Sequence, residues 1–145
     1  MKYIVNVEGA VLRDGKYLMI IRGPEESHAP GILATVGGKA EETGTHQEVF
    51  ETALKREVRE ETGIEIRPET IYLGSSVFTT DDGQLCADVM FLCRHESGEA
   101  AIRSPGEVAD LRWMTRDEIL AAPSCPPWTI RTIELAERAR RKAGW

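Results

Sequence analysis

The chain has 145 residues, of which 41% are hydrophobic and 29% charged, which suits one domain with a sizeable core spanning residues 1–145. Its formal net charge of −6 argues against nonspecific binding to nucleic acid or to a membrane surface. The three cysteines form no metal-type pair, and neither a signal peptide nor an apolar run of membrane-spanning length is visible. These features indicate a cytoplasmic protein with reduced thiols.

Apolar runs bounded by Gly, Asp and Pro predict six strands. Asp-Gly pairs at residues 14–15 and 82–83 each lie between two such runs, which is typical of β-hairpins. We expect Gly37 and Gly38 to end the third strand. In chain order, the predicted strands are residues 3–12, 17–22, 32–36, 71–79, 85–94 and 108–114.

The main helix is predicted over residues 44–63. Thr45 followed three residues later by Glu48 fits a capping box at its start. Gly63 fits the left-handed cap that commonly ends a helix.

Two further helices are predicted near the C-terminus. Thr115 with Glu118 indicates the start of a short one, and residues 127–142 form the last. Because strands lie on both sides of the main helix in the sequence, the fold class is an α/β or α+β layered fold.

The main helix carries acidic residues on its apolar face. At about 100° per residue, Glu57 lies in the middle of this face, with Glu60 and Glu61 to either side. Like charges that are buried together repel one another and lose hydration, and a cation held between them offsets both effects. Hard cations such as Mg²⁺ take oxygen ligands, so the helix predicts a divalent-metal site. The apolar members of this face are Val49, Phe50, Ala53, Leu54 and Val58.

The same segment resembles a known family motif. Residues 37–41, Gly-Gly-Lys-Ala-Glu, are followed by Glu48 and by Arg-Glu-Val-Arg-Glu-Glu-Thr-Gly-Ile at residues 56–64. This arrangement resembles the Nudix box, and the match from Glu48 to Ile64 is complete. Nine residues separate Gly38 from Glu48, four more than is usual in the family. Either the loop is longer, or the helix starts about one turn early.

The resemblance implies an α/β/α sandwich around a mixed sheet. It also implies hydrolysis of a nucleoside diphosphate linked to another group, and a homodimer is compatible with it. Mg²⁺ or Mn²⁺ would be held by Glu57, Glu60, Glu61 and the backbone carbonyl of Gly38.

The resemblance also assigns roles to the residues around these ligands. Glu48 and Arg56 would form an ion pair that holds the loop to the helix and orients the acidic face. The family takes its general base from the box or from a loop, so Glu60, Glu61 and the loop residue Glu107 are rival bases.

Substrate contacts are less well marked in the sequence. Arg22 at a strand end and Lys39 after the glycines are candidate phosphate ligands, and either could be an ordinary surface charge. Trp128 could stack on a base, although packing is the simpler interpretation. The histidines form no ligand pattern and are expected to be structural or exposed: His28, His46 and His95.

Three functions fit the sequence. The favoured one is a metal-dependent pyrophosphohydrolase, whose substrate could be an ordinary or oxidised nucleoside triphosphate, ADP-ribose or a nucleotide sugar. A non-catalytic nucleotide-sensing domain is the alternative, and loss of a box acid would support it. An isomerase acting on an isoprenoid diphosphate is the third, but Cys86 and Cys93 lie in no evident catalytic motif.

Overall fold

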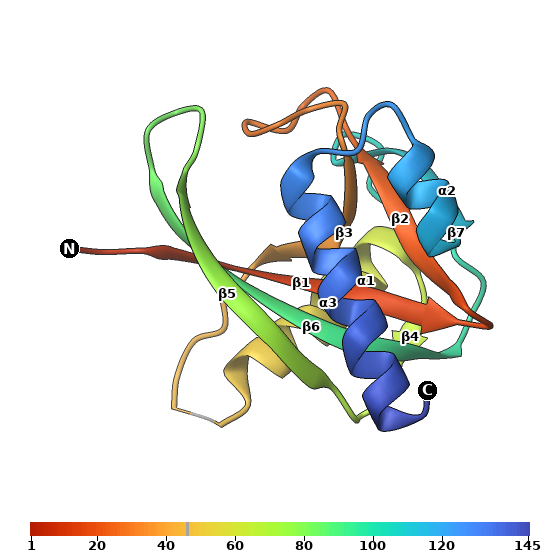
Figure 1. Ribbon diagram of the computed structural model, residues 1–145. Helices are drawn as coiled ribbons and strands as arrows, with labels where there is room; N and C mark the ends of the chain where they lie inside the picture. The colour runs from red at the N-terminus through yellow and green to blue at the C-terminus, as the bar shows by residue number, and fades with distance from the viewer. Residues whose placement is uncertain (46) are drawn as a thin grey trace.

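A seven-stranded mixed sheet forms the middle layer of the computed structural model, which describes residues 1–45 and 47–145 (Figure 1). Neighbouring strands follow the order β4-β6-β1-β3-β2-β7, and β5 pairs with β6. β1 and β6 run parallel, whereas the other pairs are antiparallel. The strands are β1 Ile4–Arg13, β2 Lys16–Arg22, β3 Leu33–Lys39, β4 Glu65–Ile66, β5 Ile71–Thr79, β6 Leu85–Ser97 and β7 Val108–Met114.

Three helices complete the α/β/α sandwich. Successive strand residues point to opposite faces of the sheet, so it has two apolar faces that each need a cover. α1 packs on one face through Leu54 and Val58, and α3 packs on the other through Ile133 and Ala136. The predicted fold class is therefore confirmed. The helices are α1 Val49–Thr62, α2 Arg116–Ala121 and α3 Pro127–Ala143.

The predicted strands are present, with one addition and one correction. The two-residue strand β4 carries too short a pattern to be recognised in the sequence. The expectation that the glycine pair ends the third strand is wrong, because β3 continues to Lys39. Gly37 pairs with Glu8 and Gly38 pairs with Val7 on β1, so both glycines belong to the sheet.

The start of the main helix also differs from the prediction. α1 begins at Val49, and the residue before it, Glu48, has a left-handed backbone (φ 53°) and makes no side-chain cap hydrogen bond. The predicted start at residue 44 and the capping box with Thr45 are therefore wrong, and the four extra residues lengthen the loop. Gly63 ends the helix at φ 78° as predicted. His46 lies outside the described residues.

The C-terminal helices match the sequence more closely. Thr115 and Glu118 form the predicted reciprocal capping box of α2. α3 is tied to the sheet by a buried polar contact, in which the hydroxyl of Tyr17 donates to Glu137 at 2.9 Å. Arg140, one turn further along α3, donates to the same carboxylate.

No helix in the described part of the chain combines the length and the apolar character needed to cross a membrane. Cys86, Cys93 and Cys125 are free thiols, as predicted. Burial raises the pKa of Cys93 to about 12, so this thiol remains protonated and unreactive at neutral pH.

Replacing Tyr17 with Phe should lower the free energy of unfolding by about 1.5–3 kcal/mol, because a buried charged acceptor loses its donor. Chemical denaturation of wild type and variant measures the difference. Tyr72→Phe is the matched control, since Tyr72 is 60% exposed on β5 and its loss should change stability by less than about 0.5 kcal/mol. Equal effects of the two substitutions would show that Tyr17 does not anchor α3.

Candidate functional site

Two carboxylates from α1 point toward the sheet. Glu61 is only 6% exposed, and the side chain of Glu57 is 13% exposed. The helical periodicity therefore predicted their positions correctly. It was wrong for Glu60, whose side chain is 58% exposed. Glu60 lies at the edge of the inward arc, where a flexible side chain turns to solvent.

Gly38 makes room for one of these carboxylates. A Cβ atom at this position would lie 2.3 Å from Cδ of Glu57 and 2.4 Å from its Oε2. Any side chain on residue 38 would therefore displace the Glu57 carboxylate. The glycine is needed for close approach of the β3 backbone to α1, since its φ angle is an ordinary one.

Arg56 holds the loop, the strand and the helix together. Its Nε donates to Glu42 at 2.8 Å, and its Nη1 donates to Glu57 at 2.8 Å. A longer bond of 3.3 Å reaches Glu60, and Nη2 donates to the carbonyl of Lys39 at 3.0 Å. The planar guanidinium thus fixes the position of the Glu57 carboxylate.

Arg56 contacts the acidic face of α1, which is compatible with the orienting role predicted for it, but its predicted partner is wrong. Within the described residues, Arg56 pairs with Glu42 in place of Glu48, which is exposed. The reason is the later start of α1, which leaves Glu48 outside the helix with a left-handed backbone. Glu42, in the preceding loop, is nearer in space although it is farther away in sequence.

Glu61 lies where a negative charge is unfavourable. Burial, together with the nearby carboxylates of Glu57 and Glu107, raises the pKa of Glu61 to about 9. The Glu107 side chain is close enough to favour the protonated form of Glu61. The loop before β7 therefore brings Glu107 to the acids of α1, as the family resemblance predicted. Oε2 of Glu61 is buried and has no hydrogen-bond partner among the described residues.

A fourth acid, Glu26, belongs to the same cluster and was not predicted. Its charge raises the pKa of Glu61, and its carboxylate accepts from Arg22 at 2.7 Å. Burial raises the pKa of Glu26 itself, against the opposing effects of Arg22 and Lys39. Glu26 lies in a polar loop with no periodic pattern, so nothing in the sequence distinguished it from a surface acid.

These oxygen atoms fit a hard divalent cation such as Mg²⁺ or Mn²⁺. The buried, unpartnered Oε2 of Glu61 and the open backbone at Gly38 beside Glu57 supply the donor types that such cations take. In residues 1–45 and 47–145, however, no three acidic, histidine or cysteine side chains already surround a single point. The structure supports Glu57, Glu61 and Gly38 as neighbours, and it leaves Glu60 toward solvent.

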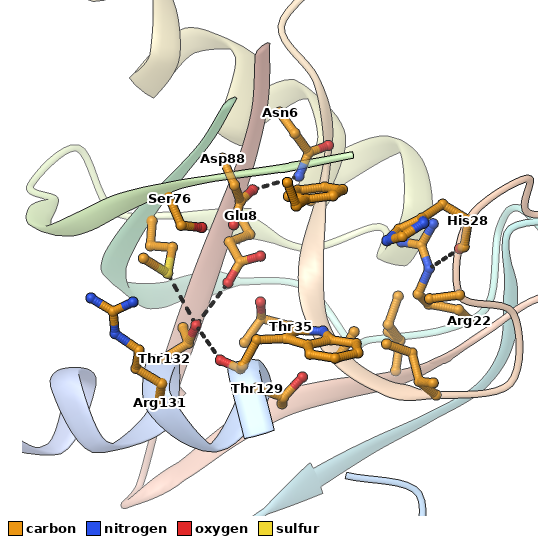
Figure 2. A pocket seen from close by; sticks show the side chains of 18 of the residues that line it. Asn6, Glu8, Arg22, His28, Thr35, Ser76, Asp88, Thr129, Arg131 and Thr132 are labelled. Carbon is orange, nitrogen blue, oxygen red and sulfur yellow. Dashed lines mark hydrogen bonds between the residues drawn. The ribbon is translucent and has the colours of Figure 1, made fainter. Parts of the chain in front are cut away.

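A cavity of about 480 Å³ is lined by Arg22, which also pairs with Glu26 of this cluster (Figure 2). Arg22 and Trp128, predicted as substrate contacts, both line it, whereas Lys39 lies outside its lining. Lys39 is nevertheless close enough to lower the pKa of Glu26. His28 lines the cavity and stacks on Phe78 with ring centroids 5.0 Å apart, a position that its loop sequence did not indicate.

Two acids that the sequence analysis missed line the cavity, the half-buried Glu8 and the buried Asp88. Glu8 on β1 and Asp88 on β6 are drawn together in Figure 2, with Asn6 beside Asp88. Each falls inside an otherwise apolar strand pattern, and their nearness depends on the parallel pairing of two strands about 80 residues apart, in which Asn6 is opposite Asp88. Strand assignment alone does not give this pairing.

Comparison with known proteins identifies the family to which this chain belongs. The sequence model of the NUDIX domain matches residues 3–135. The MutT NUDIX hydrolase of Burkholderia pseudomallei superposes with a TM-score of 0.77 at 24% identity, covering 93% of this chain and 98% of that one. The NUDIX domain of Shewanella oneidensis NrtR, solved with ADP ribose, gives a TM-score of 0.70 at 19% identity over 99% and 90% of the two chains.

Among curated sequences, this chain is similar to the NAD-capped RNA hydrolase NudC of Haemophilus influenzae. The two are 36% identical over 118 residues, which is 81% of this chain and 40% of the relative. The chain therefore spans less than half the length of the relative that it matches.

The raised pKa of Glu61 predicts how the free energy of unfolding depends on pH, measured with a chelator present. An unfolded glutamate ionises near pH 4.5, whereas Glu61 in the folded protein stays protonated up to about pH 9. Between these values the folded state binds the extra proton, so stability falls as pH rises. Glu61→Gln cannot ionise, and its stability relative to wild type should rise by at most about 1.4 kcal/mol per pH unit between roughly pH 6 and pH 8.

Glu60→Gln is the control for this measurement, because the exposed Glu60 should leave the wild-type slope unchanged. Chemical denaturation at several pH values gives the three slopes. A Glu61→Gln slope equal to that of wild type would mean that Glu61 ionises normally in the folded protein.

Proposed function

Because this chain belongs to the NUDIX domain family, we propose that it hydrolyses a diphosphate linkage in a nucleotide or another nucleoside diphosphate derivative, with Mg²⁺ or Mn²⁺ as cofactor. One observation carries the proposal. Glu57, Glu61 and Glu107 converge from α1 and from the loop before β7, next to a cavity that contains Arg22 and Trp128.

The similar proteins support the same chemistry. NudC is named as a hydrolase of NAD-capped RNA, and the NrtR domain was solved with ADP ribose. NAD and ADP ribose each contain a diphosphate that joins a nucleoside to another group. Since this chain spans 40% of NudC, the proposal takes from that relative only the diphosphate chemistry and not the RNA substrate.

The cofactor would be held by Glu57, Glu61 and the carbonyl of Gly38, with Glu60 as a further ligand where its side chain turns inward. When bound, it would neutralise phosphate oxygens and lower the pKa of a bound water. Arg56 keeps the Glu57 carboxylate in place through its bonds to the loop and to β3. Ligation by Glu61 requires its ionised form, which the positive charge of the cofactor favours.

The remaining steps of the proposed reaction depend on side chains of the protein. Attack of water on phosphorus forms one P–O bond and breaks the bridging P–O bond, whose electrons leave with the second phosphate. A carboxylate accepts the proton of the water, and Glu107 is the best-placed base because it is exposed and touches the inner acids. Arg22 and Lys39 supply local positive charge to a chain whose net charge is −6.

The glycine pair links the two parts of the site. Gly38 faces α1 and Glu57, whereas a Cβ on its neighbour Gly37 would meet the backbone of β1 at Val7 and Glu8. Gly37 also lines the cavity. A nucleoside in the cavity would thus extend its diphosphate past residues without side chains toward the carboxylates of α1.

Glu57→Gln and Glu61→Gln should each lower kcat/KM by at least about 100-fold, because each removes a charged ligand of the cofactor. Phosphate release across a nucleotide panel, with coupled phosphatase and with Mg²⁺ or Mn²⁺ titrated, measures the loss. Glu48→Gln is the matched control, since this box acid is exposed and outside the cluster. Unchanged turnover in both inner variants would overturn the metal assignment. Tight nucleotide binding without any turnover in wild type would favour a nucleotide-sensing domain.

The base can be identified by a second comparison. Glu107→Gln should reduce kcat by about 10²–10⁴-fold and remove the acidic limb of the pH–rate profile, while the affinity for metal changes little. Glu60→Gln should leave that limb intact, because its side chain points to solvent. The opposite pattern, loss of the limb only in Glu60→Gln, would transfer the role of base to Glu60.

A further inference from the structure

The cavity contains a second pair of carboxyl groups, separate from the acids of α1. The half-buried Glu8 accepts from Thr132 of α3 at 3.0 Å. Asp88 is 6% exposed and accepts from the side-chain amide of Asn6 at 2.8 Å. All four residues line the cavity, and the two acids lie close enough together for Asp88 to raise the pKa of Glu8.

Burial and close approach favour a proton on this pair. Burial raises the pKa of Glu8 well above its usual range, and the neighbouring Asp88 raises it further. Burial also raises the pKa of Asp88, against the opposing effects of Glu8 and Asn6. Both side chains line the cavity and present carboxyl oxygens to it.

The rest of the cavity suits a flat ring. Trp128 and Val77 are 58% and 57% exposed although both are large apolar residues at the cavity. Phe78, with His28 stacked on it, is part of the same lining. Aromatic and apolar walls with a few polar groups at one place are typical of a site for a planar heterocycle.

We propose that this cavity binds the base of the nucleotide and that the Glu8–Asp88 pair selects bases carrying an exocyclic amino group. The identification of the ring as a nucleobase rests on the proposed function. An amino group offers N–H donors to the oxygens of the pair, and guanine offers two parallel donors, which suit a carboxylate. Uracil presents a carbonyl oxygen where cytosine has its amino group, and this oxygen is repelled by the same acceptors. Hypoxanthine has only a C–H where guanine has its 2-amino group, so it lacks the second donor.

The geometry favours a large difference in affinity between bases with and without an amino group. A buried acceptor facing a ligand that lacks its donor loses its hydration and gains nothing in return. Charge-assisted hydrogen bonds are also stronger than neutral ones. We expect the amino-bearing member of a matched ligand pair to bind at least about tenfold more tightly.

Nucleoside monophosphates test the proposal without any cleavable diphosphate and without added metal. The probes are GMP against IMP, which differ only in the 2-amino group, and CMP against UMP, which differ in the group at position 4 and in the proton on N3. Binding is read from quenching of tryptophan fluorescence, with Trp128→Phe identifying the residue at the cavity among the three tryptophans. Wild type should prefer GMP and CMP by at least about tenfold.

Two isosteric variants locate the selectivity. Asp88→Asn and Glu8→Gln each replace a carboxyl oxygen with an N–H donor, so the preference should fall to about twofold or less, or reverse. Glu96→Gln is the matched control, because Glu96 is an exposed acid on the same strand as Asp88 and should leave the preference unchanged. Thermal unfolding establishes that each variant is folded.

Equal affinities within both ligand pairs in wild type would overturn the proposal, as would the absence of monophosphate binding. A preference that survives in both Asp88→Asn and Glu8→Gln would also overturn it. Because no diphosphate is cleaved in this experiment, a selective cavity in a protein without hydrolase activity would refute the proposed function alone. Hydrolysis without selectivity would refute the present proposal alone.

Discussion

The buried carboxylates of α1 are the constraint around which this site is arranged. Glu57 fits only because β3 has no side chain at Gly38, and Glu61 is buried deeply enough to stay protonated at neutral pH. Burying such groups is unfavourable unless a partner stabilises the charged form. Arg56 provides that partner for Glu57, and a divalent cation would provide it for Glu61.

The two faces of the sheet contribute different parts of the site. α1 covers one face and places its acids beside β3, while α3 covers the other and completes a cavity with β1, β5 and β6 (Figure 1). The acids on the two sides differ in how their carboxyl oxygens are partnered. Glu8 and Asp88 each accept a hydrogen bond from a neighbouring side chain, Thr132 and Asn6 respectively. Glu61 keeps a buried oxygen without a partner among the described residues, which is the property expected of a metal ligand.

Prediction from sequence succeeded where a local pattern had one physical cause. Apolar runs bounded by turn residues located six of the seven strands, and helical periodicity placed Glu57 and Glu61 inward. It failed for Glu60, because a residue at the edge of a helical face can turn either way, and for the start of α1, because Thr45 and Glu48 fit a cap that the longer loop does not form. Glu107 was identified only through the family resemblance.

The sequence by itself determined the layered fold, the inward acids of α1 and the arginine that orients them, since each depends on spacing along one element. Tertiary structure alone decided that Arg56 pairs with Glu42, that Glu26 joins the acidic cluster, and that Glu8 and Asp88 share a cavity. The physical reason is the range of the interactions. Periodicity records which face of an element is buried, whereas electrostatic pairing depends on distances between elements that are far apart in the chain and are brought together only by strand pairing and loop closure.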